Sequence, residues 1–289
     1  MSVSEASARS RLLFARGGII SRGWRISWAC ILGLAVVLCW LGVAVLGQAI
    51  APHGNGQIVS PDSFAPMTGA FPMGTDYLGR DMLSRVILAA RYTVGMSIAA
   101  ALVSSFVGAT LGILAAVMPG AVDSVLSRLA DAIIAVPNTM FALVVVAALG
   151  PSTPVLILTM AAMYAPGTLR ITRALALNLS QSDFVQVARA RGEGTPYIIW
   201  REILPNIIMP IMTDFGLRFV FIVLVLSGLS FLGFGVQPPA ADWGALVREN
   251  MLGLSFAAPA VIFPALAIAS LTIAVNLVLD NLPTRIEEE

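Results

Sequence analysis

Long stretches without a charged residue dominate this sequence and predict helices that cross a membrane. Residues 26–50 and 92–118 carry no charge, and each stretch is long enough to cross about 30 Å of hydrocarbon as a helix. The apolar run in the first stretch exceeds the roughly 7–15 residues of a signal-peptide core, so we expect a retained anchor. Six such helices are predicted, at 26–50, 92–118, about 125–149, about 155–178, about 205–233 and about 258–280.

The third and fourth of these helices come from one uncharged stretch, residues 132–169. Gly150, Pro151 and Pro154 interrupt it with residues that favour turns. We therefore expect a tight helical hairpin. The fold class predicted from the pattern is an all-α membrane protein with six transmembrane helices.

Six spans place both ends of the chain on the same side of the membrane, and the arginines indicate which side. The side of the termini receives twelve of them: Arg9, Arg11, Arg16, Arg22, Arg25, Arg128, Arg170, Arg173, Arg189, Arg191, Arg201 and Arg285. The opposite side receives Arg80, Arg85, Arg91 and Arg248, while Arg218 lies inside a span. Because loops rich in basic residues stay in the cytoplasm, we expect cytoplasmic tails at 1–25 and 282–289.

The segment 51–91 is the largest piece predicted on the outer side. Its first half is rich in proline and glycine, which predicts an irregular chain. In its second half Asp76 and Arg80, and likewise Asp81 and Arg85, stand four residues apart. Opposite charges at this spacing stabilise a helix. We therefore expect a short helix there, followed by a five-helix core over 92–281.

Composition narrows the class of protein. Hydrophobic residues make up 58% of the chain and charged residues 11%, against about 25% charged in a soluble domain. The net charge of +1 gives no electrostatic case for a nucleic-acid partner. All 17 basic residues are arginine, so no lysine is present for a phosphate-binding loop or a Schiff base. One histidine, His53, and two cysteines are too few for a zinc site. No catalytic residue, metal or cofactor is assigned to the chain.

The most informative segment is the polar stretch between the fourth and fifth spans, about 25 residues long, where helix hairpins commonly use about 2–8. Ser182 or Asp183 can cap a helix. Phe184, Val187 and Ala188 share one face of that helix, and Gly192 ends or bends it. A second amphipathic segment leads into the fifth span. Such a pair could dock into a groove on a soluble partner or lie on the lipid surface, and physical reasoning alone leaves both open.

Two other features could serve packing or function. Five small residues recur at every fourth position of the second span and can admit a close helix neighbour: Ala100, Ser104, Gly108, Gly112 and Ala116. Packing within the chain is favoured over sliding against a partner. Asp214 and Arg218 stand one helical turn apart in the fifth span. They could line a polar path through the membrane, or form a neutralised pair near its cytoplasmic end, since pairing lowers the cost of charge in the membrane. Trp243 is expected at the membrane interface, as aromatic residues often are.

The run 183–205 resembles the cytoplasmic coupling loop, or EAA loop, of inner-membrane subunits of bacterial ABC importers. Gln186-Val187-Ala188 stands at the Glu-Ala-Ala positions, and Gly192 and Leu204-Pro205 match the glycine and the closing Leu-Pro. The blocks 74–81 and 229–244 narrow the resemblance to the dipeptide/oligopeptide/nickel permease family, with its C-type subunit the most similar. The chain departs from the family pattern at Gln186, at Val187 and in its C-terminal residues 279–283.

The resemblance implies the type I ABC importer permease fold, with a cytoplasmic coupling loop at 179–205. It also implies a subunit that forms half of a translocation pathway for peptides or a similar small solute, nickel included. The implied partners are a second homologous permease, two cytoplasmic ATPases that bind ATP and Mg²⁺, and an external substrate-binding protein. The implied location is the bacterial inner membrane. A self-contained channel or secondary transporter is the alternative. The implied ATPase-coupling residues are Asp183, Phe184, Gln186, Val187, Ala188, Arg189, Gly192, Glu193, Leu204 and Pro205.

Overall fold

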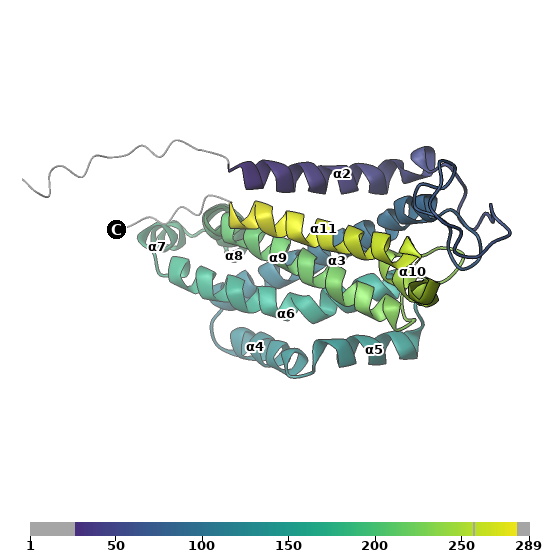
Figure 1. The fold of residues 1–289 in the computed structure, drawn as a ribbon. Coiled ribbons are helices and arrows are strands. Elements are labelled where there is room, and N and C mark those ends of the chain that lie inside the picture. The colour runs from purple at the N-terminus through teal and green to yellow at the C-terminus, as the bar shows by residue number, and fades with distance from the viewer. Residues whose placement is uncertain (1–26, 257, 282–289) are drawn as a thin grey trace, which may run out of the picture.

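Helices form nearly all of the regular structure in the computed structural model, which describes residues 27–256 and 258–281 (Figure 1). The elements in chain order are α2 (Trp28–Ile50), α3 (Met82–Val117), α4 (Ala121–Ile134), α5 (Asn138–Leu149), α6 (Thr153–Ser180), α7 (Asp183–Ala190), α8 (Thr195–Tyr197), η1 (Ile198–Ile203), α9 (Leu204–Phe231), α10 (Trp243–Glu249), η2 (Met251–Phe256), η3 (Pro259–Val261) and α11 (Ile262–Asp280). Strand-like pairing within the described ranges is limited to two isolated bridges. The all-α class is confirmed. The tails expected at 1–25 and 282–289 lie outside the described residues.

Among the described residues, five helices are long and apolar enough to cross a membrane: α2, α3, α6, the continuous α8–α9 helix and α11. The remaining predicted span is broken, because α4 and α5 meet at an angle of 88°. Pro137 at the break has no amide hydrogen and disfavours helical backbone at the residue before it. The continuous helix expected over 125–149 is therefore wrong. Six spans are reached when α4 and α5 count as one.

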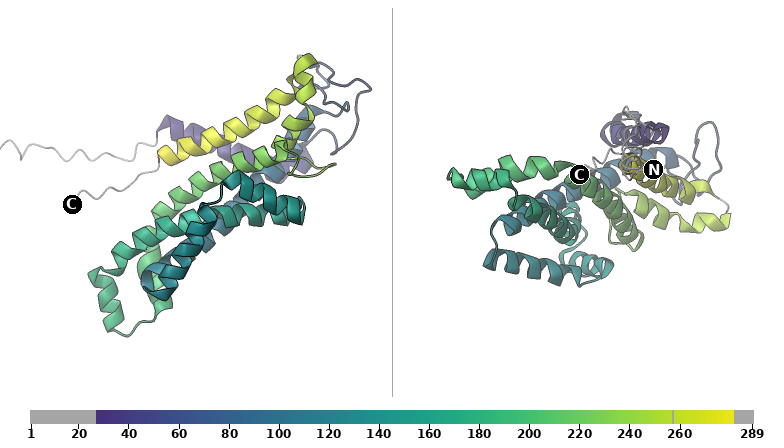
Figure 2. Two further views of the ribbon diagram at one scale, coloured as in Figure 1. Left: turned by 90° about the horizontal axis from the view of Figure 1, so that it is seen from below. Right: turned by 90° about the vertical axis from the view of Figure 1, so that its left-hand side faces the viewer.

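The helices α3, α6, α9 and α11 form the body of a bundle, and α2 lies along its outside against α11 and α3 (Figures 1 and 2). Glycine permits this close approach. A Cβ at Gly33 would lie 2.7 Å from the carbonyl oxygen of Ala274, and one at Gly47 would lie 3.1 Å from that of Ile87. The α7 helix lies at one end of the bundle, and α10 with the irregular segment 51–81 lies at the other (Figure 1). We call these the α7 end and the α10 end.

Helix α3 begins earlier than the span predicted at 92–118, because Asp81 caps it and Met82 is its first residue. The short helix expected through Asp76 and Arg80 does not form. The two residues lie instead in a turn, where one oxygen of Asp76 accepts the backbone N–H of Arg80 at 2.9 Å. Gly79 between them has a φ of +76°, which belongs to turns and not to helices. The charge spacing identified a real pair but not its backbone.

The block 74–81 folds back onto the chain just before it, and its small residues make this possible. Gly74 has a φ of +70°, and a Cβ at Gly79 would collide with the carbonyl oxygen of Ser60. Thr75 is buried, and its hydroxyl accepts the N–H of Ala65 at 2.8 Å. The motif is therefore a tightly packed turn.

Two carboxylates and two guanidinium groups join this turn to α3 and α10. The Oδ2 atom of Asp76 lies 2.6 Å from Nε of Arg80 and 2.7 Å from Nη1 of Arg85. The Oε2 atom of Glu249 lies 2.8 Å from Nη1 of Arg85 and 3.2 Å from Nη2 of Arg80. All four side chains are buried or nearly so. Their charges cancel, and pairing with hydrogen bonds is what makes buried ions tolerable. We call these residues the charge quartet.

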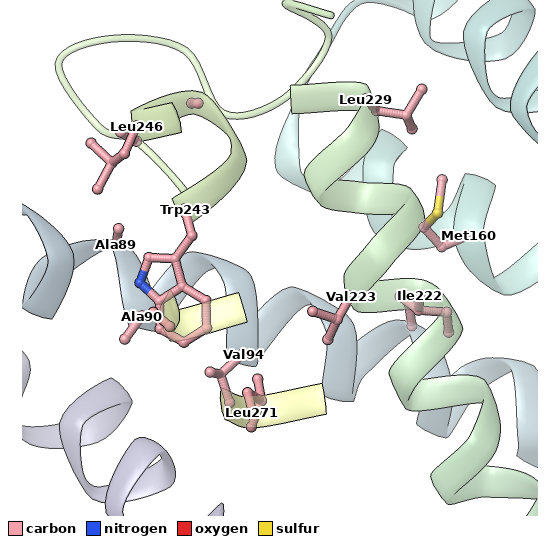
Figure 3. Close-up of a cluster of buried hydrophobic side chains, with 14 of the residues drawn as sticks. Ala89, Ala90, Val94, Met160, Ile222, Val223, Leu229, Trp243, Leu246 and Leu271 are labelled. Carbon is pink, nitrogen blue, oxygen red and sulfur yellow. The ribbon is translucent and has the colours of Figure 1, made fainter. Parts of the chain in front are cut away.

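The largest apolar core surrounds Trp243 near the α10 end (Figure 3). Its side chain is fully buried, and in Figure 3 it lies beside Ala90 and Val94 of α3 and Leu271 of α11. The indole Nε1 donates a hydrogen bond to the carbonyl oxygen of Val86 at 3.0 Å. The interfacial position expected for this tryptophan is wrong, because α10 folds back into the bundle and carries the side chain with it.

Asp242, the N-cap of α10, holds the loop between α9 and α10. Its carboxylate accepts hydrogen bonds from the hydroxyl of Ser230 at 2.7 Å and from the N–H groups of Val236 and Ala245, each at 3.1 Å. Burial raises the pKa of the Asp242 carboxyl, while the Ser230 hydroxyl lowers it. A Cβ at Gly235 would collide with this hydroxyl. The 229–244 block therefore forms an ordered loop that is held by hydrogen bonds to Asp242.

Candidate functional site

The α7 helix follows α6 and precedes α9 in the chain, and neighbouring residues in the sequence set its limits. Ser182 is its N-cap residue, with extended backbone. Gly192 follows its end with a φ of +81°. The amide of Glu193 donates to the carbonyl oxygen of Ala188 at 3.2 Å, which is the longer-range bond of the Schellman motif. The stop at Gly192 is confirmed. Ser182 stands at the N-cap position as predicted, but its hydroxyl donates to the carbonyl oxygen of Leu179 and does not cap the helix.

The two faces of α7 differ in exposure. Val185 and Ala188 are fully buried, whereas Phe184 is 40% exposed and Val187 is 56% exposed. The sequence grouped Ala188 with the exposed pair, and this grouping is wrong. Ala188 is four residues from Phe184 but three from Val185, so it can belong to either face. Only the neighbouring apolar cluster decides between them.

The buried face belongs to an apolar cluster at the α7 end. Residues of α3, α6, α7, η1 and α9 form it. Its buried members are Ala109, Ile113, Ala116, Val117, Ala176, Val185, Ile198, Ile199, Ile203, Ile207 and Ile211. Leu204 packs against this cluster and is half-buried. The segment 183–203 is therefore anchored to the bundle along one side and open along the other.

The second part of the segment is a short turn of π-helix, η1, that runs directly into α9. The amide of Leu204 donates to the carbonyl oxygen of Ile199, a spacing of five residues that widens the helix. Pro205 in the first turn of α9 is exposed. Trp200 is 51% exposed, and Tyr197 is exposed beside it. Sequence reasoning missed both aromatics, although their type and position in the predicted loop could have indicated them.

The polar residues of the segment face outward. Asp183 and Arg189 are exposed at opposite ends of α7, and each has the sign that the helix dipole favours at its end. Gln186 is exposed, and its side-chain amide donates to the carbonyl oxygen of Gln181 at 2.9 Å. Glu193 is half-buried. The exposed apolar pair is thus bordered by polar groups.

Replacing Gly192 by alanine is expected to destabilise the end of α7 by about 1–2 kcal/mol, because an L-residue pays that much for left-handed backbone. No atom lies within 4 Å of the added Cβ, so backbone strain is the whole effect. Amide hydrogen exchange over 185–193 measures it. Gly194→Ala is the matched control, since Gly194 has a negative φ and room for a Cβ. Equal exchange in both variants would contradict the expectation.

The ridge of small residues on α3 faces α6 of the same chain. A Cβ at Gly108 would lie 2.5 Å from the carbonyl oxygen of Ala165, and one at Gly112 would lie 2.6 Å from that of Leu169. The other ridge residues, Ala100, Ser104 and Ala116, are buried as well. The structure places the ridge in helix packing inside the chain.

Asp214 and Arg218 form a two-pronged ion pair on α9, with Oδ2 to Nε at 2.6 Å and Oδ1 to Nη2 at 2.8 Å. Helix α6 completes the arrangement. The hydroxyl of Thr168 donates to Oδ2 of Asp214 at 2.8 Å, and Nη1 of Arg218 donates to the carbonyl oxygen of Tyr164 at 3.0 Å. The carboxylate of Asp214 is therefore buried and paired with a guanidinium group and a hydroxyl group.

The described residues contain no group of three histidine, cysteine, aspartate or glutamate side chains that could hold a metal ion. His53 lies beside Asp81, with Nδ1 3.2 Å from Oδ2. Cys30 and Cys39 are both free thiols on α2.

Comparison with known proteins bears on this arrangement. A sequence model of the family described as "Binding-protein-dependent transport system inner membrane component" matches residues 108–288. A glutathione transport system permease protein of Pectobacterium atrosepticum is 32% identical over 268 residues, which cover 90% of this chain and 89% of that protein. A putative peptide transport system permease protein of Brucella suis is 34% identical, with 94% and 89% covered. A dipeptide transport system permease protein of Haemophilus influenzae is 31% identical, with 87% and 88% covered.

Proposed function

This chain belongs to the inner-membrane components of binding-protein-dependent transport systems, and we propose that its segment 183–205 is the surface through which a separate ATPase drives it. The protein is the permease subunit of an ABC importer and a multi-pass protein of the bacterial inner membrane. Members of this family are inner-membrane components of transport systems. The sequence of this chain has no phosphate-binding loop of the G-x-x-x-x-G-K-[ST] type. ATP and Mg²⁺ therefore belong to partner subunits in this proposal.

The observation that carries the proposal is the exposed pair Phe184 and Val187 on a helix whose opposite side is anchored. Apolar residues three apart on a short helix are the usual anchors for a groove on a partner protein. Trp200 and Tyr197 are further exposed aromatic residues of the same segment. Val185 on the other face of α7 is buried against the bundle. A partner that displaces α7 therefore also displaces the bundle helices packed against it.

Lipid is the other candidate for this surface, and the composition of α7 disfavours it. A helix that lies on a membrane presents a broad apolar face with basic residues on the polar face. The exposed apolar part of α7 consists of two residues, and the same short helix presents Asp183 and Gln186. A groove on a soluble protein fits a narrow stripe with a polar border.

The proposed mechanism is alternation of two packed states. This chain and a second homologous permease enclose the path, and two ATPases hold one coupling segment each. Because ATP binds only the closed ATPase pair, its binding shifts the permeases toward one state and its hydrolysis returns them. The α7 end and both termini then face the cytoplasm, and the α10 end faces the substrate-binding protein.

The proposed cargo is a short peptide or a similar small solute. The relatives described above are named for glutathione, peptide and dipeptide transport. The described residues hold no metal-binding group, and nickel as cargo has no support beyond the sequence resemblance. Uptake assays with a panel of dipeptides, tripeptides and glutathione identify the cargo.

The double variant Phe184→Asp/Val187→Asp is expected to abolish peptide uptake and to lose the ATPase during purification of the complex. Charge placed in an apolar interface costs several kcal/mol, because the partner groove offers it no counter-charge. The measurement is the amount of ATPase that co-purifies with the tagged chain, together with uptake into proteoliposomes. Leu204 is a poorer target than the exposed pair, since a charge there would also disturb the apolar cluster against which it packs.

Gln181→Asp/Ala190→Asp is the matched control for this experiment. It adds the same two negative charges at exposed positions on either side of the Phe184–Val187 pair. The control is expected to keep both the ATPase and uptake. Retention of the ATPase by the double variant would show that α7 is not the docking surface.

A further inference from the structure

Residues 183–203, the part of the coupling segment that precedes α9, connect the two long helices α6 and α9. A displacement of these residues therefore displaces both helices. Helix α6 ends at Ser180 just before them, and α9 begins at Leu204 just after them. Near the segment, α6 and α9 meet through apolar side chains. Apolar contacts are non-directional, so they allow one helix to slide along the other. A device that fixes the register of α6 against α9 would have to be polar.

The ion pair of α9 supplies such directional contacts at one level of the bundle. Two hydrogen bonds connect α6 and α9. The hydroxyl of Thr168 on α6 donates to Asp214 on α9, and Arg218 on α9 donates to the carbonyl oxygen of Tyr164 on α6. Both involve a charged group, which makes them stronger than neutral hydrogen bonds. The two-pronged pair between Asp214 and Arg218 fixes the guanidinium in one orientation.

Helix α6 is shaped to receive this guanidinium. A Cβ at Gly167 would lie 2.9 Å from both Nη1 and Nη2 of Arg218, so only glycine leaves the space that the side chain fills. Pro166, the residue before it, lies inside the helix and leaves one helical carbonyl without its donor. Gly167 therefore leaves a notch in α6 that the guanidinium of Arg218 fills.

The position of the contact along both helices is nearly the same. Asp214 is ten residues from Leu204 and Thr168 is twelve residues from Ser180, which correspond to about 15 Å and 18 Å of helix. The two helices are therefore joined at two levels, by the coupling segment at their ends and by this contact about 15–18 Å further along. A displacement of that segment reaches the α10 half of the bundle through both helices at once.

We propose that Asp214, Arg218, Thr168 and Gly167 form a positioning clamp that makes α6 and α9 move as one body when the ATPase moves the coupling segment. The clamp residues position the helices and do not contact cargo. The proposal rests on the function proposed for 183–205. With the clamp weakened, α6 and α9 slip past each other, so that ATP is still hydrolysed but less of the motion reaches the translocation path.

The test uses the whole transporter in proteoliposomes, with its second permease, ATPases and binding protein. The measured quantity is the number of peptide molecules imported per ATP hydrolysed. Thr168→Val keeps the size of the side chain and removes one cross-helix bond. We expect the ratio to fall by about 2- to 30-fold, the range for mutations that disturb coupling between sites. Thr168→Ser restores the hydroxyl and is expected to restore the ratio.

Thr172→Val is the matched control. Thr172 lies one turn further along α6 and is buried to the same degree, but its hydroxyl has no hydrogen-bond partner among the described residues. It is expected to keep the wild-type ratio. An unchanged ratio in Thr168→Val, or equal losses at both threonines, would overturn the clamp, and so would a lower unfolding temperature with the ratio intact.

Two further arms keep the outcome decisive. If Thr168→Val does not assemble, Gly167→Ala displaces the guanidinium from the other side and is judged by the same ratio. Failure of the docking proposal shows separately, because the double variant Phe184→Asp/Val187→Asp would then retain its ATPase. Loss of ATPase in that variant, with an unchanged ratio in Thr168→Val, refutes the clamp alone.

Discussion

Replacing Arg85 by methionine is expected to destabilise the protein by about 3–5 kcal/mol, the usual cost of removing one partner from a buried ion pair. Arg85 lies between Asp76 and Glu249, at 2.7 Å and 2.8 Å from their oxygens. Without it, two buried carboxylates share the single guanidinium of Arg80. Methionine fills much of the space, so the loss reflects charge more than volume.

The damage should be concentrated at the α10 end. The charge quartet is what ties the turn at 74–81 to α3 and α10, so the segment 51–81 should loosen first. Thermal unfolding of the purified protein in detergent gives the stability, and limited proteolysis shows whether cleavage begins within 51–81. The α7 end, which has its own apolar cluster, should keep its protection.

Arg91→Met is the matched control for this prediction. Arg91 is six residues further along α3 and exposed, and no ion pair involves it within the described ranges. Surface substitutions of this kind change stability by less than about 0.5 kcal/mol. Indistinguishable unfolding of the two variants would mean that the charge quartet does not hold the α10 end together.

Replacing Trp243 by alanine should cost a similar amount, about 3–5 kcal/mol, because a large buried aromatic leaves a cavity that the surroundings only partly fill. The indole ring lies edge-on to Trp40 of α2, with ring centroids 4.6 Å apart. The indole Nε1 of Trp243 donates to the carbonyl oxygen of Val86 on α3 at 3.0 Å. The side chain therefore joins α2, α3 and α10, and its loss should loosen α2 as well as α10.

Thermal unfolding again gives the size of this effect, and hydrogen exchange in α2 gives its reach. Trp28→Ala is the matched control, since Trp28 is 86% exposed at the start of the same α2 helix. It should leave unfolding unchanged in detergent. Equal effects from the two tryptophans would show that the core around Trp243 contributes no more than a surface position.

The candidate site was predicted in position but not in orientation. The limits of α7 follow from Ser182 and Gly192, whose preferences are local and can be read from a single sequence. Which side of α7 is exposed depends on the isoleucines of η1 and the end of α3, which are distant in sequence. For that reason the prediction placed Ala188 on the wrong face, while Phe184 and Val187 are exposed as expected.

The charged residues show the same division. Spacing along the chain identified Asp76 with Arg80 and Asp214 with Arg218 as pairs. Spacing could not identify the partners that complete each site, such as Glu249 in the charge quartet or Thr168 beside Asp214. These partners come from other helices and have no local signal. The sequence therefore indicated which charged residues pair within one segment. The fold showed which other helices each pair contacts.

By itself, the sequence determined the all-α class, the membrane-crossing character of the helices, the turn at Gly150 and the limits of the short helix that begins at Asp183. These depend on hydrophobic stretches, prolines, glycines and helix caps, all of which act over a few neighbouring residues. Only the tertiary structure decided the 88° break between α4 and α5, the burial of Trp243, the charge quartet and the hydrogen bonds between α6 and the Asp214–Arg218 pair of α9. Each of these brings together residues far apart in the chain, and packing in three dimensions alone selects such contacts.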